Sequence, residues 1–204
     1  VSGFAHLLSE RHGQELSERG RHFLDNIRTA SDRMERLIDD LLRYARLART
    51  PVQLRTVPLQ PVFTELLEQR ASRIMEEGAR VRVPDDLPAV LGEPVLLQQI
   101  FGNLLDNALT YHLPDSTADV DISWRRENDT VVVRVRDKGI GIPAEHHEKV
   151  FRIFQRLHGD DQYPGTGIGL ANVRKAIDHL RGDIRIVPPD DGGTCFHVTL
   201  RSSQ

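Results

Sequence analysis

The sequence predicts an α+β protein in which a helical hairpin precedes a mixed sheet that is covered by helices. The first fifty residues contain no proline, few β-branched residues and many arginines and leucines, which is typical of helix. Beyond them, short runs that alternate apolar and polar residues are interspersed with longer amphipathic runs, which indicates strands and helices. The strands come in hairpins and the helices come in runs, and this order favours one sheet covered by helices, an α/β sandwich.

The amino-terminal hairpin is predicted from a heptad seam. Apolar or small residues recur at steps of three and four at Leu24, Ile27, Ser31, Met34, Ile38, Leu41, Ala45 and Ala48. We therefore predict a helix from about Gln14 to about Ala48, preceded by the end of another helix at residues 4–8 and a turn at Gly13. One hairpin cannot bury two long apolar stripes, so we expect it to form a four-helix bundle with a second copy of the chain. Packing of the hairpin on its own chain is the alternative.

A domain boundary is predicted at Thr50–Pro51, because proline cannot continue a helix and restricts the residue before it. This divides the chain into a helical domain of residues 1–50 and a second domain of residues 51–204. In the second domain the patterns predict helices over residues 62–77, 95–111 and 168–180, and strands over residues 80–83, 120–126, 131–136, 184–187 and 195–200. Gly78 and Gly182 end helices, Pro94 begins one, and Asn128–Asp129 marks a hairpin turn.

Three short segments in a fixed order predict a nucleotide site: 103–108, 137–142 and 165–171. In the first, Asn103 and Asn107 lie four residues apart on one helix face, where their amide oxygens can ligate a hard cation such as magnesium. In the second, Asp137 precedes a glycine turn and can accept a hydrogen bond from an exocyclic amine. The glycines of the second and third segments allow the backbone to approach a ligand closely.

Composition excludes several classes of function. The net charge of −3 and the pI near 6.3 do not fit a nucleic-acid-binding surface, which would be basic and clustered. No apolar run approaches the ~20 residues that span a bilayer. Cys195 is the single cysteine, which fits a reducing compartment, so we expect a cytoplasmic location. The chain begins at Val1 without a secretory signal pattern, and we expect it to be part of a longer protein.

Competing interpretations of the motifs fit less well. The spacing of Gly165, Gly167 and Gly169 is wrong for a dinucleotide fingerprint, and no strand directly precedes it. The Gly-Lys-Ser/Thr ending of a P-loop is absent from the sequence. His146–His147 could bind zinc, but no third ligand is spaced to complete the site, and we interpret this pair as part of a solvated face.

The three segments 103–108, 137–142 and 165–171, taken in this order, make the sequence resemble the kinase core of two-component sensor histidine kinases. The resemblance extends over nearly its whole length. Asn103–Ala108 resembles the N box of that family, Asp137–Ile142 the first glycine box, Phe151–Arg156 the F box, and Gly165–Ala171 the second glycine box. Gly192–Thr194 resembles the glycine turn before the last strand. The resemblance implies a dimerisation hairpin and the Bergerat-type ATP-binding fold shared with gyrase, Hsp90 and MutL. Residues 154–167 are similar to the phytochrome-type subset, which implies a light sensor upstream.

The resemblance implies ATP and Mg²⁺ as ligands and assigns roles to residues. Asp137 would accept from the adenine amino group, Asn103 would hold magnesium, and Asn107 and Arg156 would act at the phosphates. Arg156 would also open a lid that extends to about Pro164. The other residues expected at the nucleotide are Tyr111, His112, Gly139, Gly141, Ile142, Gly165, Thr166, Gly167, Ile168, Gly169 and Leu170.

The resemblance also implies partners and a reaction. A homodimer formed by the hairpin would transfer the γ-phosphoryl group of ATP to a histidine, from which it would pass to an aspartate of a response regulator. The acceptor histidine is expected about nine residues before Val1, so the chain alone is not expected to phosphorylate itself. The sequence departs from the family pattern at Thr110, where a lysine is usual, and His112 or Arg156 could compensate. The alternative function is a nucleotide-binding, dimerising module with weak or no kinase activity, or a phosphatase-biased regulator. A serine kinase or a clamp ATPase of the same fold is a remote third interpretation.

Overall fold

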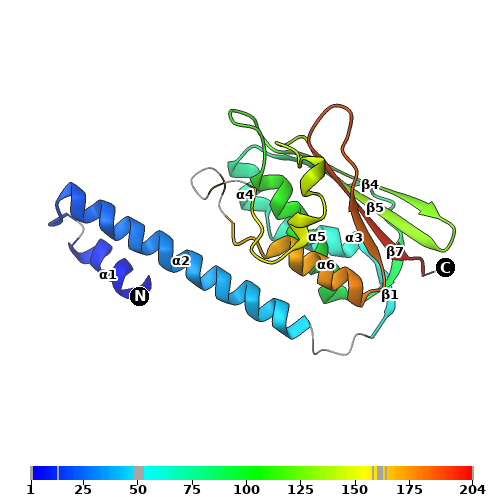
Figure 1. The fold of residues 1–204 in the computed structure, drawn as a ribbon, viewed down its shortest axis with the longest axis horizontal. Coiled ribbons are helices and arrows are strands. Elements are labelled where there is room, and N and C mark those ends of the chain that lie inside the picture. Colours follow the sequence, from blue (N-terminus) through cyan, green and yellow to red (C-terminus); the bar gives the residue numbers. More distant parts are fainter. Residues whose placement is uncertain are drawn as a thin grey trace.

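The computed structural model describes residues 2–12, 14–47, 53–157, 159, 163 and 165–203. A helical hairpin extends from an α/β domain, and only the carboxyl-terminal half of its long helix lies alongside that domain (Figure 1). The hairpin consists of α1 (Ser2–His12) and α2 (Glu18–Leu47). The long helix begins later than predicted because residues 14–16 form a turn, and the Ser17 hydroxyl caps the new start by accepting from Gly20 N at 3.2 Å.

Some features predicted from the sequence lie outside the described residues. These are the turn at Gly13, the last seam position Ala48, the boundary at Thr50–Pro51 and the lid end at Pro164.

The main sheet has five strands in the order β2-β4-β5-β7-β6, in which β2 and β4 are parallel and the other neighbours are antiparallel. The strands are β2 (Arg80–Arg82), β4 (Asp119–Glu127), β5 (Thr130–Asp137), β6 (Asp183–Ile186) and β7 (Thr194–Arg201). A second sheet pairs β1 (Arg55–Pro58) with β3 (Ala89–Gly92). This small sheet was not predicted, because each of its strands is only four residues long and shows little alternation.

Helices α3, α5 and α6 pack on one face of the main sheet (Figure 1). Their bounds are α3 (Leu59–Glu68), α4 (Ala71–Glu76), α5 (Pro94–Thr110) and α6 (Gly169–His179), and short 3₁₀ helices η1 (Ala144–His146) and η2 (Lys149–Phe151) precede the lid. The single helix predicted over residues 62–77 is instead two helices. The chain breaks at Arg70, whose guanidinium donates to both carboxylate oxygens of Asp106 at 2.7 Å.

The core lies between these helices and the sheet. Phe63 of α3 and Phe101 of α5 are fully buried, with ring centroids 4.8 Å apart. Trp124 of β4 packs against the edge of this core, and its indole N–H donates to Asp86 at 3.2 Å. The packed face of the sheet is therefore apolar, as the alternation in the sequence predicts.

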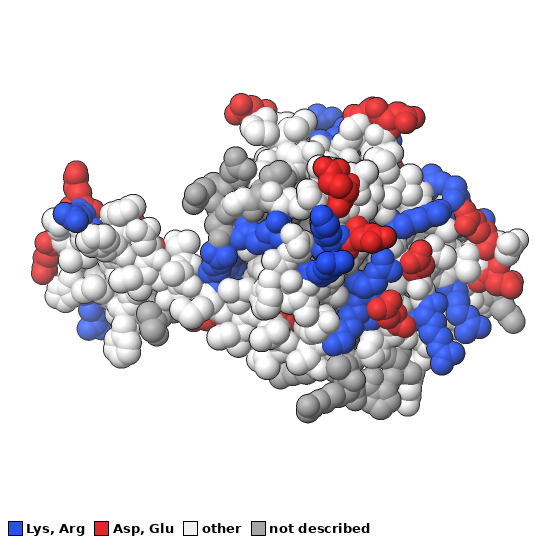
Figure 2. All heavy atoms as spheres, in the orientation of Figure 1, with Lys and Arg blue, Asp and Glu red and all other residues white. Residues whose placement is uncertain are grey.

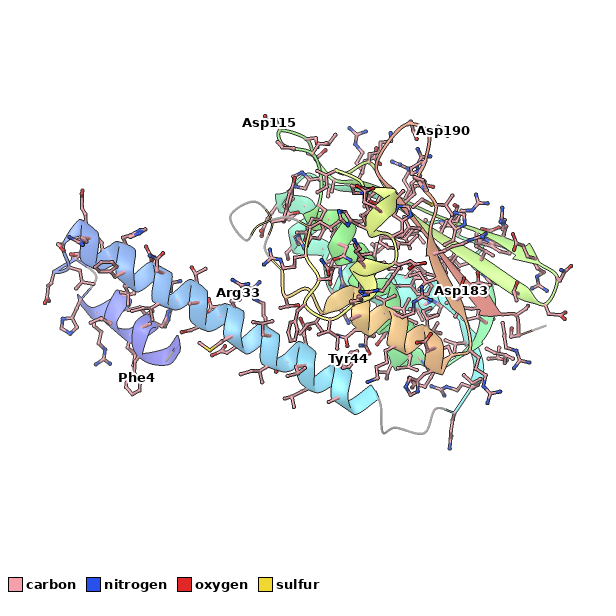
Figure 3. All side chains as sticks on the ribbon, in the orientation of Figure 1. Phe4, Arg33, Tyr44, Asp115, Asp183 and Asp190 are labelled. Carbon is pink, nitrogen blue, oxygen red and sulfur yellow. The ribbon has the colours of Figure 1, made fainter. Side chains whose placement is uncertain are left out.

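The apolar seam of α2 is mostly uncovered. Leu24 and Ser31 are buried, whereas Met34 and Ile38 are each 55% exposed. On α1, Phe4 points away from α2 and is 83% exposed (Figure 3). No helix among the described residues is both long and apolar enough to cross a membrane.

Candidate functional site

A cavity of about 470 Å³ lies between α5, the sheet, the amino terminus of α6 and the carboxyl-terminal half of α2. Most residues predicted at the nucleotide line this cavity, namely Asn103, Asn107, Tyr111, Asp137, Gly141, Ile142, Arg156, Gly165, Thr166, Gly167, Gly169 and Leu170. His112, Gly139 and Ile168 are the predicted residues that do not line it. The three boxes are far apart in the sequence, and the fold brings them to one hollow.

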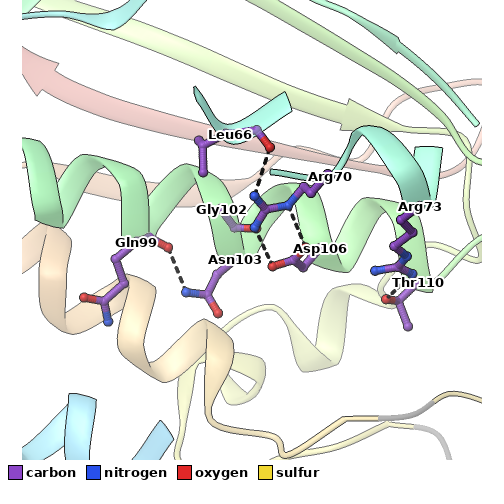
Figure 4. Close-up of polar contacts among 8 residues, drawn as sticks. All are labelled: Leu66, Arg70, Arg73, Gln99, Gly102, Asn103, Asp106 and Thr110. Carbon is purple, nitrogen blue, oxygen red and sulfur yellow. Dashed lines mark hydrogen bonds and ion pairs between the residues drawn. The ribbon is translucent and has the colours of Figure 1, made fainter. Parts of the chain in front are cut away.

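One face of α5 forms a polar wall of the cavity. Asn103, Asp106, Asn107 and Thr110 follow the helical spacing and all line the hollow, while the opposite face of the helix is buried in the core. The Asn103 amide donates from Nδ2 to Gln99 O at 2.7 Å, which leaves its Oδ1 as the free acceptor (Figure 4). That oxygen lies 2.8 Å from the position where a Cβ at Gly169 would stand, so the amide lies directly against the start of α6.

Neighbouring contacts fix this wall in place. Arg70 holds Asp106 and also donates to the carbonyls of Leu66 and Gly102 at 3.1 and 3.3 Å, which joins α3 to α5 (Figure 4). Arg73 of α4 donates to the Thr110 hydroxyl at 3.1 Å (Figure 4). A guanidinium from another helix therefore stands beside the position where the family pattern has a lysine.

Asp137 ends β5 at the opposite wall of the cavity. It is 7% exposed, and its Oδ1 accepts from Gly139 N at 2.8 Å and from Thr194 N at 3.1 Å. Burial raises the pKa of this carboxyl, and the hydrogen bonds from Gly139 and Thr194 oppose that rise. Both backbone donors bind the same oxygen, Oδ1, and neither of them occupies Oδ2.

Glycine is required around Asp137 because the backbone is crowded there. A Cβ at Gly139 would stand 2.2 Å from Tyr111 O, and one at Gly193 would stand 2.0 Å from Asp137 O. Gly193 also has a φ of +83°, which disfavours other residues. Gly139 does not line the cavity, and its role here is to let the turn pass behind the carboxylate.

The residues that flank the predicted lid on either side contact each other. Phe154 N donates to Gly167 O at 2.9 Å, and both residues have positive φ angles, +63° and +72°. Gly169 then begins α6, and no side chain of the described residues forms a capping hydrogen bond to that helix. The first backbone N–H groups of a helix are ready donors for an anion, so the amino terminus of α6 can bind phosphate oxygens.

Two tyrosines join the lid to the end of α5. The rings of Tyr111 and Tyr163 lie 5.2 Å apart, and the Tyr163 hydroxyl donates to His112 O at 2.9 Å. Arg156 Nη2 donates to Tyr163 O at 2.8 Å. Burial raises the pKa of the Tyr111 hydroxyl, and the nearby Arg156 charge lowers it. His112 thus takes part through its backbone carbonyl.

Sequence reasoning missed the wall supplied by α2. Arg36, Asp39 and Asp40 line the cavity, and the Thr166 hydroxyl donates to Asp40 Oδ2 at 2.6 Å. No sequence pattern indicates this wall, because charged residues off a heptad seam are usually solvated.

A second contact joins α2 to α6. Lys175 Nζ donates to Tyr44 O at 2.8 Å and stands 3.7 Å from the centre of the Tyr44 ring, beside α6 in Figure 3. Tyr44 lies in the last turn of α2, where a cation interacts favourably with the negative end of the helix dipole. The hairpin therefore meets the α/β domain at both the lid and α6.

The oxygen donors around the cavity fit a hard divalent cation. Among the residues that the structure describes, none donates to Asn103 Oδ1, and amide and carboxylate oxygens are the ligands that magnesium prefers. The carboxylates that line the hollow, Asp39, Asp40, Asp106 and Asp137, outnumber the guanidinium groups of Arg36 and Arg156. A bound polyphosphate would therefore need added positive charge. The visible face of the α/β domain carries basic and acidic side chains side by side (Figure 2).

Comparisons with known proteins agree with this architecture. Residues 92–204 match the family described as histidine kinase-, DNA gyrase B- and HSP90-like ATPase, and residues 1–50 match the His kinase A (phospho-acceptor) domain. Over 200 residues, 98% of the chain, it is 36% identical to the phytochrome-like protein Cph1 of Synechocystis sp. and covers 26% of that protein. It is 35% identical to the adaptive-response sensory kinase SasA of Gloeothece citriformis, covering 82% of this chain and 43% of that one.

Solved structures show the same fold. Full-length ShkA, whose structure is a complex with AMPPNP, superposes with a TM-score of 0.71 at 24% identity, over 98% of this chain and 42% of that one. The histidine kinase AdeS of Acinetobacter baumannii gives 0.70 at 17% identity, over 100% of this chain and 94% of that one. The chain spans about a quarter to less than half of the length of the curated relatives named above.

Proposed function

This chain belongs to the histidine kinase-, DNA gyrase B- and HSP90-like ATPase family and is a two-component histidine kinase core, and on that premise we propose that it binds Mg·ATP in the 470 Å³ cavity for transfer of the γ-phosphoryl group to a histidine. The observation that carries the proposal is the convergence of Asp137, Asn103 and the uncapped start of α6 on that cavity. Adenine would lie at the buried carboxylate, and the phosphates would lie at the helix end.

The chain's own residues would act by positioning and by charge. Asp137 Oδ2 would accept from the adenine amino group, which selects adenine over a base with a carbonyl at that position. The N–H groups that begin α6 and the Arg156 guanidinium would donate to phosphate oxygens. Asn103 and Asn107 would hold the magnesium ion, which supplies charge neutralisation when bound. Phosphoryl transfer needs mainly this kind of positioning and electrostatic stabilisation.

The wider reaction follows from family membership and is part of the proposal. The acceptor would be a histidine upstream of Val1 on a dimerising hairpin, and a response-regulator aspartate would then receive the phosphoryl group. Similarity to a phytochrome-like protein supports a sensor upstream. We place the reaction in the cytoplasm, in keeping with the lone Cys195.

Calorimetric titration with a non-hydrolysable ATP analogue and Mg²⁺ tests the binding step. Asp137→Asn replaces the acceptor oxygen with an amide that can place a donor against the adenine amino group, so affinity should fall by about tenfold or more. Asp129→Asn, an exposed change in the β4–β5 turn, is the matched control. Retention of affinity within about twofold in Asp137→Asn would show that adenine binds elsewhere.

A second function is favoured by Thr110, whose hydroxyl holds Arg73 instead of presenting a charge of its own. The chain would then be a nucleotide-gated signalling module with weak or no kinase activity, or a regulator biased towards dephosphorylation. Phosphotransfer to a separately supplied hairpin that carries the family histidine distinguishes the two. A large gain on Thr110→Lys supports the weak kinase, whereas an active wild type that Thr110→Lys leaves unchanged supports an ordinary kinase with Arg73 as the nearby cation.

A further inference from the structure

The face of the main sheet turned away from the nucleotide cavity carries a second hollow, of about 460 Å³. On β5 and β7, Arg134, Arg136, Cys195 and His197 alternate with core residues and point to this side. The register places Arg134 beside His197 and Arg136 beside Cys195, so the hollow crosses two adjacent strands. Nothing in the proposed kinase chemistry uses these residues.

Three buried nitrogen atoms at this hollow lack a hydrogen-bond partner among the described residues. They are Arg134 Nε, Arg136 Nε and His197 Nδ1. His197 is only 8% exposed, so its ring is held inside the hollow and not in bulk water. Buried polar atoms are normally paired, and a ligand with acceptor oxygens placed here would satisfy these three nitrogens.

The arginines near this hollow differ in whether they form ion pairs. Arg82 pairs with Asp119 and Asp121, and Arg136 pairs with Asp191. Arg134, by contrast, makes no ion pair or side-chain hydrogen bond to any residue that the structure describes, although it lies between other charged side chains. The guanidinium next to His197 is therefore available to pair with an anion.

The rim of the hollow favours an organic ligand over a bare ion. Val187, Pro188 and Pro189 form one side of it, and Val187 is 37% exposed. An inorganic ion would leave these apolar groups uncovered. A peptide would cover them with its own backbone and side chains while an acidic side chain reached Arg134. Asp121 also lines the hollow, but its carboxylate is paired with Arg82.

We propose that this hollow is a docking site for an acidic peptide segment of a partner protein, with one glutamate or aspartate carboxylate seated between Arg134 and His197. The carboxylate supplies the acceptor that the orphaned nitrogens lack. The site lies on the opposite face from the nucleotide cavity, so both can be filled at once.

Occupation of the site has a spectroscopic consequence at His197. Burial is the first cause of the lowered pKa of this imidazole, and the charges of Arg134 on β5, Arg185 on β6 and Arg125 on β4 lower it further, while Glu127 on β4 raises it. A carboxylate placed beside the ring would oppose these arginines. The imidazole pKa should therefore rise when the peptide binds.

The test uses the whole 204-residue chain and a fluorescein-labelled hexaglutamate peptide at fixed ionic strength. Fluorescence anisotropy gives the affinity, and imidazole NMR gives the pKa of His197 with and without peptide. Arg134→Gln should weaken binding by about tenfold, since a charged hydrogen bond is lost. Arg126→Gln, an exposed arginine on the same hairpin outside the hollow, should change it by less than about twofold.

Three results would overturn the proposal. One is a His197 pKa that does not move in the wild-type protein at saturating peptide, a measurement that needs no variant to fold. Another is an equal loss in Arg126→Gln, which would mean diffuse charge attraction. The third is displacement of the peptide by inorganic phosphate at equal or lower concentration, which would identify a small-ion site.

Discussion

At the scale of single residues, close packing of backbone against backbone fixes the geometry around Asp137. The glycines on either side of it are there because a side chain would strike a carbonyl oxygen. The sequence predicted Gly139 and Gly141 as places where the backbone approaches a ligand, and Gly193 only as part of a turn. Gly141 does line the cavity, but Gly139 and Gly193 serve the chain itself. Only the three-dimensional contacts with the Tyr111 and Asp137 carbonyl oxygens reveal this.

Gly139→Ala should therefore destabilise the protein. The new Cβ would lie 2.2 Å from Tyr111 O, and the turn would have to move, at a cost of about 2–3 kcal/mol. Gly159→Ala is the matched control, because no atom of the residues described by the structure lies within 4 Å of the added Cβ, and its effect should stay within about 0.5 kcal/mol. Urea unfolding followed by circular dichroism measures both. Equal stability of the two variants would contradict this account of the turn.

Asp137 should also give the stability a pH dependence of defined sign. Its pKa is raised in the folded state, so the folded state holds the proton more tightly than the unfolded state. The contribution of this group is full below the ordinary aspartate pKa and is lost as the pH rises through the folded pKa. When both proteins are measured from pH 4 upward, the unfolding free energy of Asp137→Asn should accordingly increase relative to that of the wild type as the pH rises. A difference that is flat with pH would show that burial does not perturb this carboxyl.

At the scale of elements, the sequence predicted the long, strongly patterned segments and missed the short or context-dependent ones. The α5 helix was predicted because Pro94 begins it and apolar residues recur along it, and the β4–β5 hairpin because Asn128–Asp129 interrupts two alternating runs. The break at Arg70 was missed, since it depends on Asp106, 36 residues away. The α2 wall of the cavity was missed for the same reason: Asp40 meets Thr166 across 126 residues.

The position of Asp40 at the cavity leads to a prediction about nucleotide affinity. Asp40 lines the cavity with Asp39 and would repel a polyphosphate, so Asp40→Asn should raise the affinity for an ATP analogue by about threefold, ~0.7 kcal/mol, the magnitude of an exposed charge interaction. Asp25→Asn, on the same helix but outside the cavity, should have no effect on this affinity. Weaker binding by Asp40→Asn in calorimetry would mean that this carboxylate helps to hold the cation instead.

At the scale of the whole molecule, an uncovered hairpin accompanies a fully packed α/β domain. The exposed seam of α2 fits a helical partner, and the match to the phospho-acceptor domain family points to a second copy. Charge at the seam should prevent such pairing, so Ile38→Glu should raise the dimer dissociation constant by about tenfold or more. Met75→Glu, at a 79% exposed apolar residue of the α/β domain, is the control. Sedimentation equilibrium measures the dissociation constants of both variants. If Ile38→Glu left the dimer unaffected, the interface would lie elsewhere.

Trp124 gives the molecule one built-in optical reporter, because it is the only tryptophan of the chain. It is held to Asp86 at the edge of the core and does not line either hollow described above. Its emission should thus stay constant while ligands are added and change only when the sheet comes apart. Melting curves recorded through this indole will follow the α/β domain alone, and separation of the hairpin from it will pass unseen unless a second dye is attached to α2.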